Sequence, residues 1–280
     1  MINILIGGGI GKFDQISQFV EDNTHIFDHI KLSVYDGPNN CKWNGGRINR
    51  NCFFKLDHLD FYADHNIDVK LVFTNNIIDL DDPVGNELLQ AFHKQGNGVT
   101  LINDKLRSYI RYNYPEYKLT YSITGIDNIN VPMKRSDVDK YKQLERDYDY
   151  IVPRAEHNLD PKMLLLNTNK YELYITEGCC TKCPVWTKHF ESISEGNRNI
   201  DLFTNKIAKK YEDCWLERGS SEFDFDAHIL DENQVMDLYR KGFKYFKLSG
   251  RDADHRPGTG SYIDYLDTIK QIHTRVLNDQ

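Results

Sequence analysis

The sequence has no long hydrophobic run and no recognisable export signal. No stretch approaches the roughly 20 apolar residues needed to cross a bilayer. The apolar segment Asn3–Gly9 is too short for a signal-peptide core and lacks a basic start. We therefore expect a cytoplasmic protein with no membrane contact. In that reducing compartment, the six cysteines favour metal or redox chemistry over a disulfide framework.

Several familiar catalytic and phosphate-binding motifs are also missing. There is no G-x-S-x-G nucleophile elbow and no H-E-x-x-H zinc helix. The glycine-rich segment Gly7–Lys12 does not fit a phosphate loop, because Ile6 replaces the first glycine and Phe13 replaces the hydroxyl residue. We interpret this segment as a tight turn after a strand. The net charge of -7 does not favour long-range attraction of a nucleic acid.

Apolar, β-rich segments alternate with helical patterns along the whole chain. Eight strand–helix units in 280 residues favour a closed TIM-like (β/α)8 barrel, an α/β fold, over an open doubly wound sheet. We expect a single domain, 1–280, with Cys179–His228 as a loop and helical insertion at the C-terminal rim, before the last strand. A short helix is predicted at Pro161–Leu166. The predicted strands are Asn3–Gly7, His29–Tyr35, Asp68–Phe73, Gly98–Ile102, Lys118–Ile123, Tyr148–Val152, Lys170–Ile175 and Phe243–Leu248.

Five cysteines fall on the rim where the loops after parallel strands converge. Cys41 follows the second strand, Cys179, Cys180 and Cys183 follow the seventh, and Cys214 lies in the insertion. Closely spaced thiolates can bind one metal ion or two irons of a cluster, with the other ligands coming from distant loops. Zinc sites more often use two close pairs, and the second pair is missing. We therefore favour a 4Fe-4S iron–sulfur cluster, with zinc or metal-free buried thiols as alternatives; nearby Cys52 is interpreted as packing.

Charged residues also follow several predicted strands. Arg47, Arg154 and Arg251 are placed to bind a carboxylate or phosphate in a bidentate manner. The alternative is that they pair with the many acidic residues of the surface. Glu156 and Glu177 are candidate proton-transfer groups, or partners for those arginines. We take these five residues as the candidate catalytic set.

Three stretches of the chain resemble the U32 collagenase-like peptidase family. Gly98–Asp104 and Tyr117–Thr124 resemble one of its strand–helix–strand segments, and Glu177–Pro184 resembles its cysteine region. Leu238–Arg251 is similar to the strand that ends in K-I-E-G-R in the family, with Ser249 in place of the glutamate. The resemblance spans about residues 30 to 275. It implies a barrel-like fold and, in several subfamilies, a four-cysteine iron–sulfur cluster.

The resemblance implies more than one activity. Some family members are named as peptidases, and others support oxygen-independent hydroxylation of ubiquinone precursors or RNA bases, with prephenate as the implied oxygen source. Our main prediction is an iron–sulfur-dependent redox enzyme that resembles these hydroxylases and acts on a small aromatic, nucleobase or RNA substrate. A protein partner from the same family is a further expectation. The alternatives are a U-type peptidase and a non-catalytic protein with a structural zinc or thiolate site.

Overall fold

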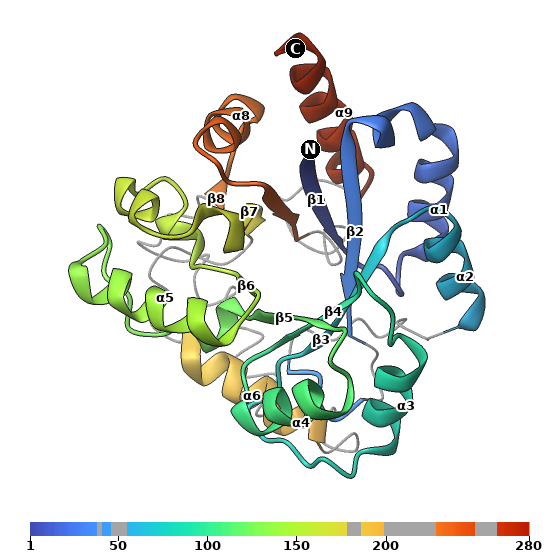
Figure 1. Ribbon diagram of the computed structural model, residues 1–280, viewed down its shortest axis with the longest axis vertical. Helices are drawn as coiled ribbons and strands as arrows, with labels where there is room; N and C mark the ends of the chain where they lie inside the picture. Colours follow the sequence, from blue (N-terminus) through green and yellow to red (C-terminus); the bar gives the residue numbers. More distant parts are fainter. Residues whose placement is uncertain (38–40, 46–54, 178–185, 199–227, 250–261, 280) are drawn as a thin grey trace, which may run out of the picture.

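The computed structural model describes residues 1–37, 41–45, 55–177, 186–198, 228–249 and 262–279. Within these residues, eight parallel strands form a nearly closed barrel with helices around its outside (Figure 1). The predicted fold class is therefore confirmed. All eight correspond to the strands expected from sequence: β1 (Ile2–Gly7), β2 (Ile30–Asp36), β3 (Asp68–Phe73), β4 (Gly98–Leu101), β5 (Lys118–Tyr121), β6 (Tyr150–Ile151), β7 (Glu172–Glu177) and β9 (Tyr245–Leu248).

The strands are hydrogen-bonded in the order β6-β5-β4-β3-β2-β1-β9-β7. A parallel bridge between Ile151 and Tyr171 joins the two ends of this order and brings β6 next to β7. A further strand, β8 (His228–Ile229), runs antiparallel to the end of β7. β8 was not predicted from the sequence, because two residues are too few to show a periodic pattern.

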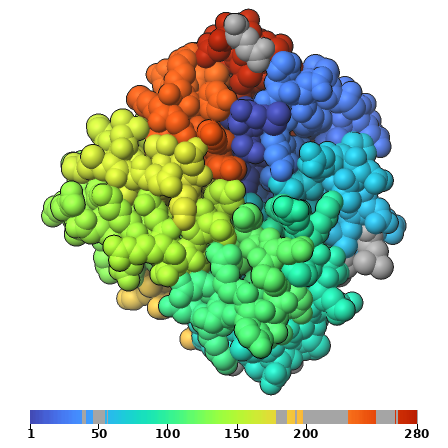
Figure 2. All heavy atoms as spheres, in the orientation of Figure 1, coloured from blue at the N-terminus to red at the C-terminus, as the bar shows by residue number. Residues whose placement is uncertain are grey.

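Helices or short 3-10 turns follow the strands in chain order. Figure 2 shows N-terminal segments in blue, central segments in green and C-terminal segments in orange to red, packed side by side around one face. The α-helices are α1 (Phe13–Asp22), α2 (Leu56–Asp64), α3 (Pro83–Ala91), α4 (Asp104–Asn113), α5 (Arg135–Asp147), α6 (Trp186–Arg198), α8 (Glu232–Arg240) and α9 (Tyr262–Asn278). The 3-10 turns are η1 (Thr24–Asp28), η2 (Ile123–Gly125), η3 (Ala155–His157), η4 (Pro161–Leu165) and η5 (Thr168–Lys170). Among the described helices, none is long and apolar enough to span a membrane.

The α-helix expected at Pro161–Leu166 is wrong, because this segment forms the 3-10 turn η4. Asp160 Oδ1 accepts a hydrogen bond from the backbone N–H of Lys162 over 2.9 Å, and this bond starts the turn. Asn167 then accepts from the N–H of Asn169, which starts a separate turn and ends the run. The segment between β6 and β7 therefore covers the barrel with short turns.

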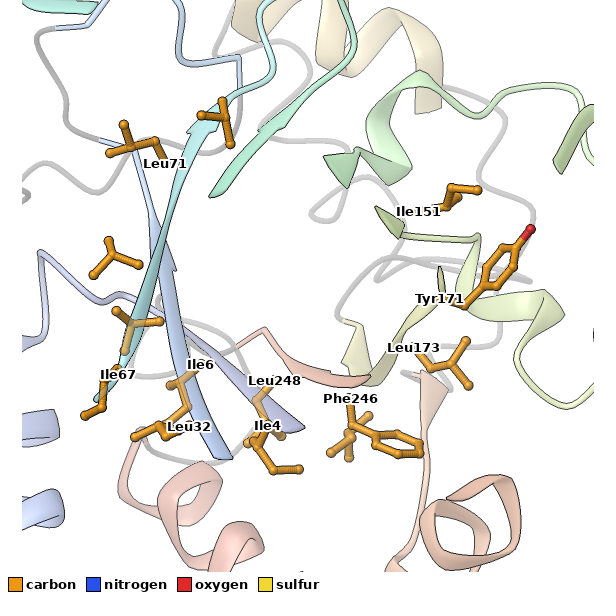
Figure 3. Packing of buried hydrophobic residues seen from close by; sticks show 14 of the residues in the cluster. Ile4, Ile6, Leu32, Ile67, Leu71, Ile151, Tyr171, Leu173, Phe246 and Leu248 are labelled. Carbon is orange, nitrogen blue, oxygen red and sulfur yellow. The ribbon is translucent and has the colours of Figure 1, made fainter. Parts of the chain in front are cut away.

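Strand alternation separates two kinds of side chain. Outward-facing residues such as Ile4, Leu32 and Leu71 pack beneath the helices and form the main core (Figure 3). Inward-facing positions include a smaller cluster of Leu5, Val72 and two tyrosines, Tyr35 and Tyr245. The interior of the barrel also contains charged and hydroxyl side chains, and these define the candidate site.

Candidate functional site

Three ionisable side chains meet inside the barrel. Lys70 comes from β3, Glu172 from β7 and Lys247 from β9, and all three are buried. Lys70 Nζ forms an ion pair with Glu172 Oε1, and Lys247 Nζ lies 3.5 Å from Glu172 Oε2. Interiors of TIM barrels are usually filled by branched apolar side chains. A buried ionic cluster is therefore a departure that calls for a structural or catalytic reason.

The surroundings of Glu172 keep its carboxyl group ionised. Thr120 Oγ1 on β5 donates to Glu172 Oε1 over 3.1 Å and accepts from Lys70 Nζ over 3.3 Å. Burial alone would raise the pKa of Glu172, but the charges of Lys70 and Lys247 and these hydrogen bonds outweigh it and lower the pKa below 4.5. The ionised carboxylate can therefore hold both ammonium groups.

Aromatic rings complete the cluster. Lys70 Nζ lies 4.4 Å from the ring centroid of Tyr150, and Lys247 Nζ lies 4.0 Å from that of Tyr35. The hydroxyl of Tyr150 donates to that of Tyr245 over 3.1 Å. A ring face attracts a cation through its quadrupole, most strongly where water is excluded. Each ammonium group is thus positioned by one carboxylate oxygen and one ring.

A glycine makes room for the Lys70 side chain. Gly98 on β4 is the register partner of Lys70 on β3. A Cβ at position 98 would lie 2.7 Å from the backbone oxygen of Lys118 and 3.4 Å from Lys70 Cγ. Any larger residue would press on both the neighbouring strand and the lysine stem.

Of the five predicted catalytic residues, Arg154 and Glu156 form a buried ion pair after β6. Arg154 Nε lies 3.2 Å from Glu156 Oε2, and Nη2 lies 2.8 Å from Oε1. The guanidinium carbon also lies 3.8 Å from the ring centroid of Trp186 on α6. Arg154 therefore anchors α6 to the rim, and Glu156 is its bidentate partner.

Glu177 is the last residue of β7 and is buried at the C-terminal mouth of the barrel. Its backbone is the register partner of His228 on β8. Because β7 is hydrogen-bonded to β9, Glu177 and Lys247 come from neighbouring strands. The other two predicted catalytic residues, Arg47 and Arg251, lie outside the described residues.

Cys41 is buried in the main core next to the start of α3. Its Sγ lies 3.6 Å from Asp82 Oδ2, to which it donates, and Asp82 caps α3 by accepting from the N–H of Gly85. Burial raises the pKa of the Cys41 thiol, and the charge of Asp82 raises it further. A thiol held protonated in this way is a poor metal ligand.

The other proposed ligands, Cys179, Cys180, Cys183 and Cys214, lie outside the described residues, as does Cys52. Among the residues that the structure does describe, no group of three His, Cys, Asp or Glu side chains is arranged to hold a metal ion. The shared cysteine centre therefore stays a prediction.

The glycine-rich turn after β1 is closed by a carboxylate. Asp36 Oδ2 at the end of β2 accepts from the backbone N–H of Ile10 at 3.2 Å and of Gly11 at 3.0 Å. These are the donors that a phosphate would need. The segment is thus a turn held by an internal acceptor.

Helix α6 lies on the C-terminal rim and joins loops from different parts of the barrel. Its first residue, Trp186, packs with residues that follow β5 and β6. Near its other end, Ser194 O accepts from Asn75 Nδ2 over 2.9 Å, and Asn197 Nδ2 donates to Asn44 O. In Figure 1 the helix passes behind α4 and α5. Its residues fall within Cys179–His228, the range predicted from sequence to be an insertion.

The ionic cluster was not predicted from the sequence, although a signal for it was present. A strand covered on both faces reads as a nearly continuous apolar run. Lys70, Glu172 and Lys247 each interrupt such a run at an inward position. Lys247 also stands at the lysine of the K-I-E-G-R-like stretch.

The fold and the cluster define a TIM-like α/β barrel with a charged interior. No protein-family model and no curated protein matches the chain significantly. Among solved structures, the U32 peptidase Mk0906 has a TM-score of 0.56 and 14% identity, covering 89% of this chain and 93% of that one. A mutant tryptophan synthase alpha-subunit from the hyperthermophile Pyrococcus furiosus has a TM-score of 0.42 and 11% identity, and the match covers 97% of this chain and 99% of that one. The likeness to the U32 peptidase shows a shared fold and agrees with the resemblance noted in the sequence.

Proposed function

We propose that the chain is a peptide-bond hydrolase whose reaction centre lies at the C-terminal mouth of the barrel. The observation that carries this proposal is the likeness to a U32 peptidase structure over nearly the whole length of both chains. Barrel enzymes hold their active sites at this face, which supports the same location here. The buried ionic cluster supports it further, because a purely apolar interior would be enough to hold the barrel together.

Peptide hydrolysis needs a base that activates water and a positive group that stabilises the oxyanion. Glu177 at the end of β7 supplies a carboxylate for the first role. Lys247 on the adjacent strand β9 supplies an ammonium group for the second. Glu172 positions that ammonium group from inside the barrel. In this proposal Glu177 is the general base that takes a proton from the attacking water and returns it to the amine nitrogen as the C–N bond breaks, and Lys247 is the cation that stabilises the oxyanion.

The test is hydrolysis of labelled casein and of a random peptide library, with cleavage products read by mass spectrometry. Glu177→Gln and Lys247→Met should each lower the rate by about 100-fold, the size of effect seen when an oxyanion donor is lost. Lys118→Met is the matched control, because it makes the same change at an exposed position on β5 and should leave the rate unchanged. Absence of cleavage by the wild type, or full activity in both site variants with native circular dichroism, contradicts the proposal.

An iron–sulfur redox enzyme is the second candidate, favoured by the spacing of Cys179, Cys180 and Cys183. Its substrate would be a small aromatic compound, a nucleobase or RNA. The measurement is iron and sulfide content after anaerobic purification, in wild type and Cys183→Ala. Cys41→Ala should leave the iron content unchanged, because that thiol is buried against Asp82. A colourless protein with stoichiometric zinc would support the structural-zinc alternative.

A further inference from the structure

Ten buried side-chain polar atoms have no hydrogen-bond partner within the described part of the chain, and four of them belong to α6, to β4 or to the end of β3. These four are Thr74 Oγ1, Thr100 Oγ1, Trp186 Nε1 and Asn197 Oδ1. Their residues are between 2% and 5% exposed. We call these four atoms the unsatisfied set. Native proteins leave few buried polar groups unpaired, because each one costs free energy, so an unpaired group calls for a polar partner such as water or a ligand.

Two members of the set belong to the barrel wall. Thr100 on β4 is the register partner of Thr120 on β5, whose hydroxyl contacts Lys70 and Glu172 in the interior. Thr100 therefore occupies the same inward-facing layer as the ionic cluster. Thr74 directly follows β3, next to the Asn75 side chain that binds α6.

The other two members lie at opposite ends of α6. Trp186 and Asn197 are 11 positions apart, which corresponds to roughly 16 Å at the helical rise per residue. An extended peptide of about five residues covers the same length. The indole N–H is a donor, suited to a peptide carbonyl, and the Asn197 amide oxygen is an acceptor, suited to a peptide N–H.

We propose that the substrate binds as an extended main chain between α6 and the barrel, along the line from Trp186 to Asn197, with the unsatisfied set as its hydrogen-bond partners. This inference rests on the proposed peptidase function and names its substrate class: a segment of about five residues, recognised through its backbone rather than its side chains. Entry requires α6 to lift from the rim, which breaks the contacts of Asn75 with Ser194 and of Asn197 with Asn44.

The test uses variants that remove a polar atom of the unsatisfied set. In Thr100→Val and Trp186→Phe, binding of a fluorescein-labelled random hexapeptide pool, measured by anisotropy, should weaken about tenfold. The melting temperature of Thr100→Val should not fall, because the variant keeps the side-chain shape and the hydroxyl has no described partner to lose. That of Trp186→Phe should fall, because the smaller ring leaves space in a packed cluster and weakens the contact with Arg154. The matched control is Thr120→Val, which removes a hydroxyl that is hydrogen-bonded to Glu172 and should lower the melting temperature.

The outcomes separate this inference from the proposed reaction. Unchanged pool binding by Thr100→Val and Trp186→Phe overturns the inference and shows that ordered water satisfies these atoms, whether or not peptides are cleaved. Equal binding of a pool with N-methylated backbone amides overturns main-chain recognition in the same way. Pool binding that is lost in both variants supports the inference even if the wild type cleaves no peptide, in which case only the hydrolase proposal fails.

Discussion

Lys70 and Lys31 both pair with acidic residues, but in different surroundings. The Lys70–Glu172 pair is almost fully buried, whereas the side chains of Lys31 and Asp68 are 33% and 21% exposed. Lys70→Met should lower the free energy of unfolding by about 3–5 kcal/mol, because it removes a buried counter-charge of Glu172. Lys31→Met should lower it by at most about 1 kcal/mol, because water screens that pair. Urea unfolding measures both, and equal small losses would show that Lys70 does not balance Glu172.

His157 gives stability a dependence on pH. The ring lies between Tyr141 and Asn130, with Nδ1 2.8 Å from the tyrosine hydroxyl and Nε2 3.0 Å from the backbone oxygen. Burial lowers the pKa of His157 below 6.5 in the folded protein, although several nearby acidic groups oppose this. As pH falls below 6.5, the unfolded chain takes up a proton that the folded chain resists, so the folded state loses stability.

The variant His157→Gln should weaken this effect. The unfolding free energy of the wild type should fall between about pH 7 and pH 5, and that of His157→Gln should fall less steeply over the same interval. Urea titrations at several pH values measure the two slopes. His58 and His273 also have lowered pKa values through burial, so part of the wild-type slope should remain. Identical slopes would mean that His157 titrates normally.

At the scale of one helix, Gly85 of α3 packs closely against the ring of Trp43. In most helices Gly→Ala is stabilising by up to about 1 kcal/mol. In α3, however, a Cβ at position 85 would lie 2.3 Å from the Trp43 ring, which is fully buried. Gly85→Ala should therefore destabilise the protein by about 1–3 kcal/mol. Thermal unfolding should show this loss, whereas Glu87→Ala, an exposed position on the same helix, should change little. A gain in stability for Gly85→Ala would show that Trp43 can shift.

Elements with strong local patterns were predictable, and the others were not. All eight barrel strands were found because each is an apolar run, buried on at least its outer face. The segment Pro161–Leu165 contains enough leucine to suggest a helix, but side-chain acceptors at Asp160 and Asn167 divide it into short turns. Its Leu164 and Leu165 side chains remain exposed. Local hydrogen bonds outweighed hydrophobic periodicity there.

The ionic cluster could not be predicted at the scale of the whole molecule. Lys70 and Glu172 are 102 positions apart and meet across the barrel. Alternation gives the face of each strand, but not which inward residues come opposite each other, because that depends on the stagger of all the strands. The predicted rim residues Arg154 and Glu156 are neighbours in sequence, and pairing between them was one of the roles considered. Short-range partners were therefore accessible to sequence reasoning, and cross-barrel partners were not.

The barrel closes at the junction between β6 and β7, which we call the seam. β1 and β2 are in register over six residue pairs, whereas the structure joins β6 to the residue before β7 through the bridge between Ile151 and Tyr171. The segment after β6 also forms 3-10 turns instead of a long helix. Because the seam has few hydrogen bonds and is covered by short turns, we expect it to be the first region of the barrel to open in local unfolding.

Hydrogen exchange read by mass spectrometry tests this expectation. Backbone amides around Ile151 and Tyr171 should exchange faster than those of β1 and β2 in the native protein. Lys70→Met should accelerate exchange at the seam more than at β1 and β2, because Glu172 directly follows Tyr171 and its ion pair ties β7 to β3 on the opposite side. Lys31→Met, which alters a partly exposed pair, should leave the seam unchanged. Seam amides as protected as those of β1 in the wild type would mean that β6 and β7 close the barrel as firmly as the longer strand pairs do.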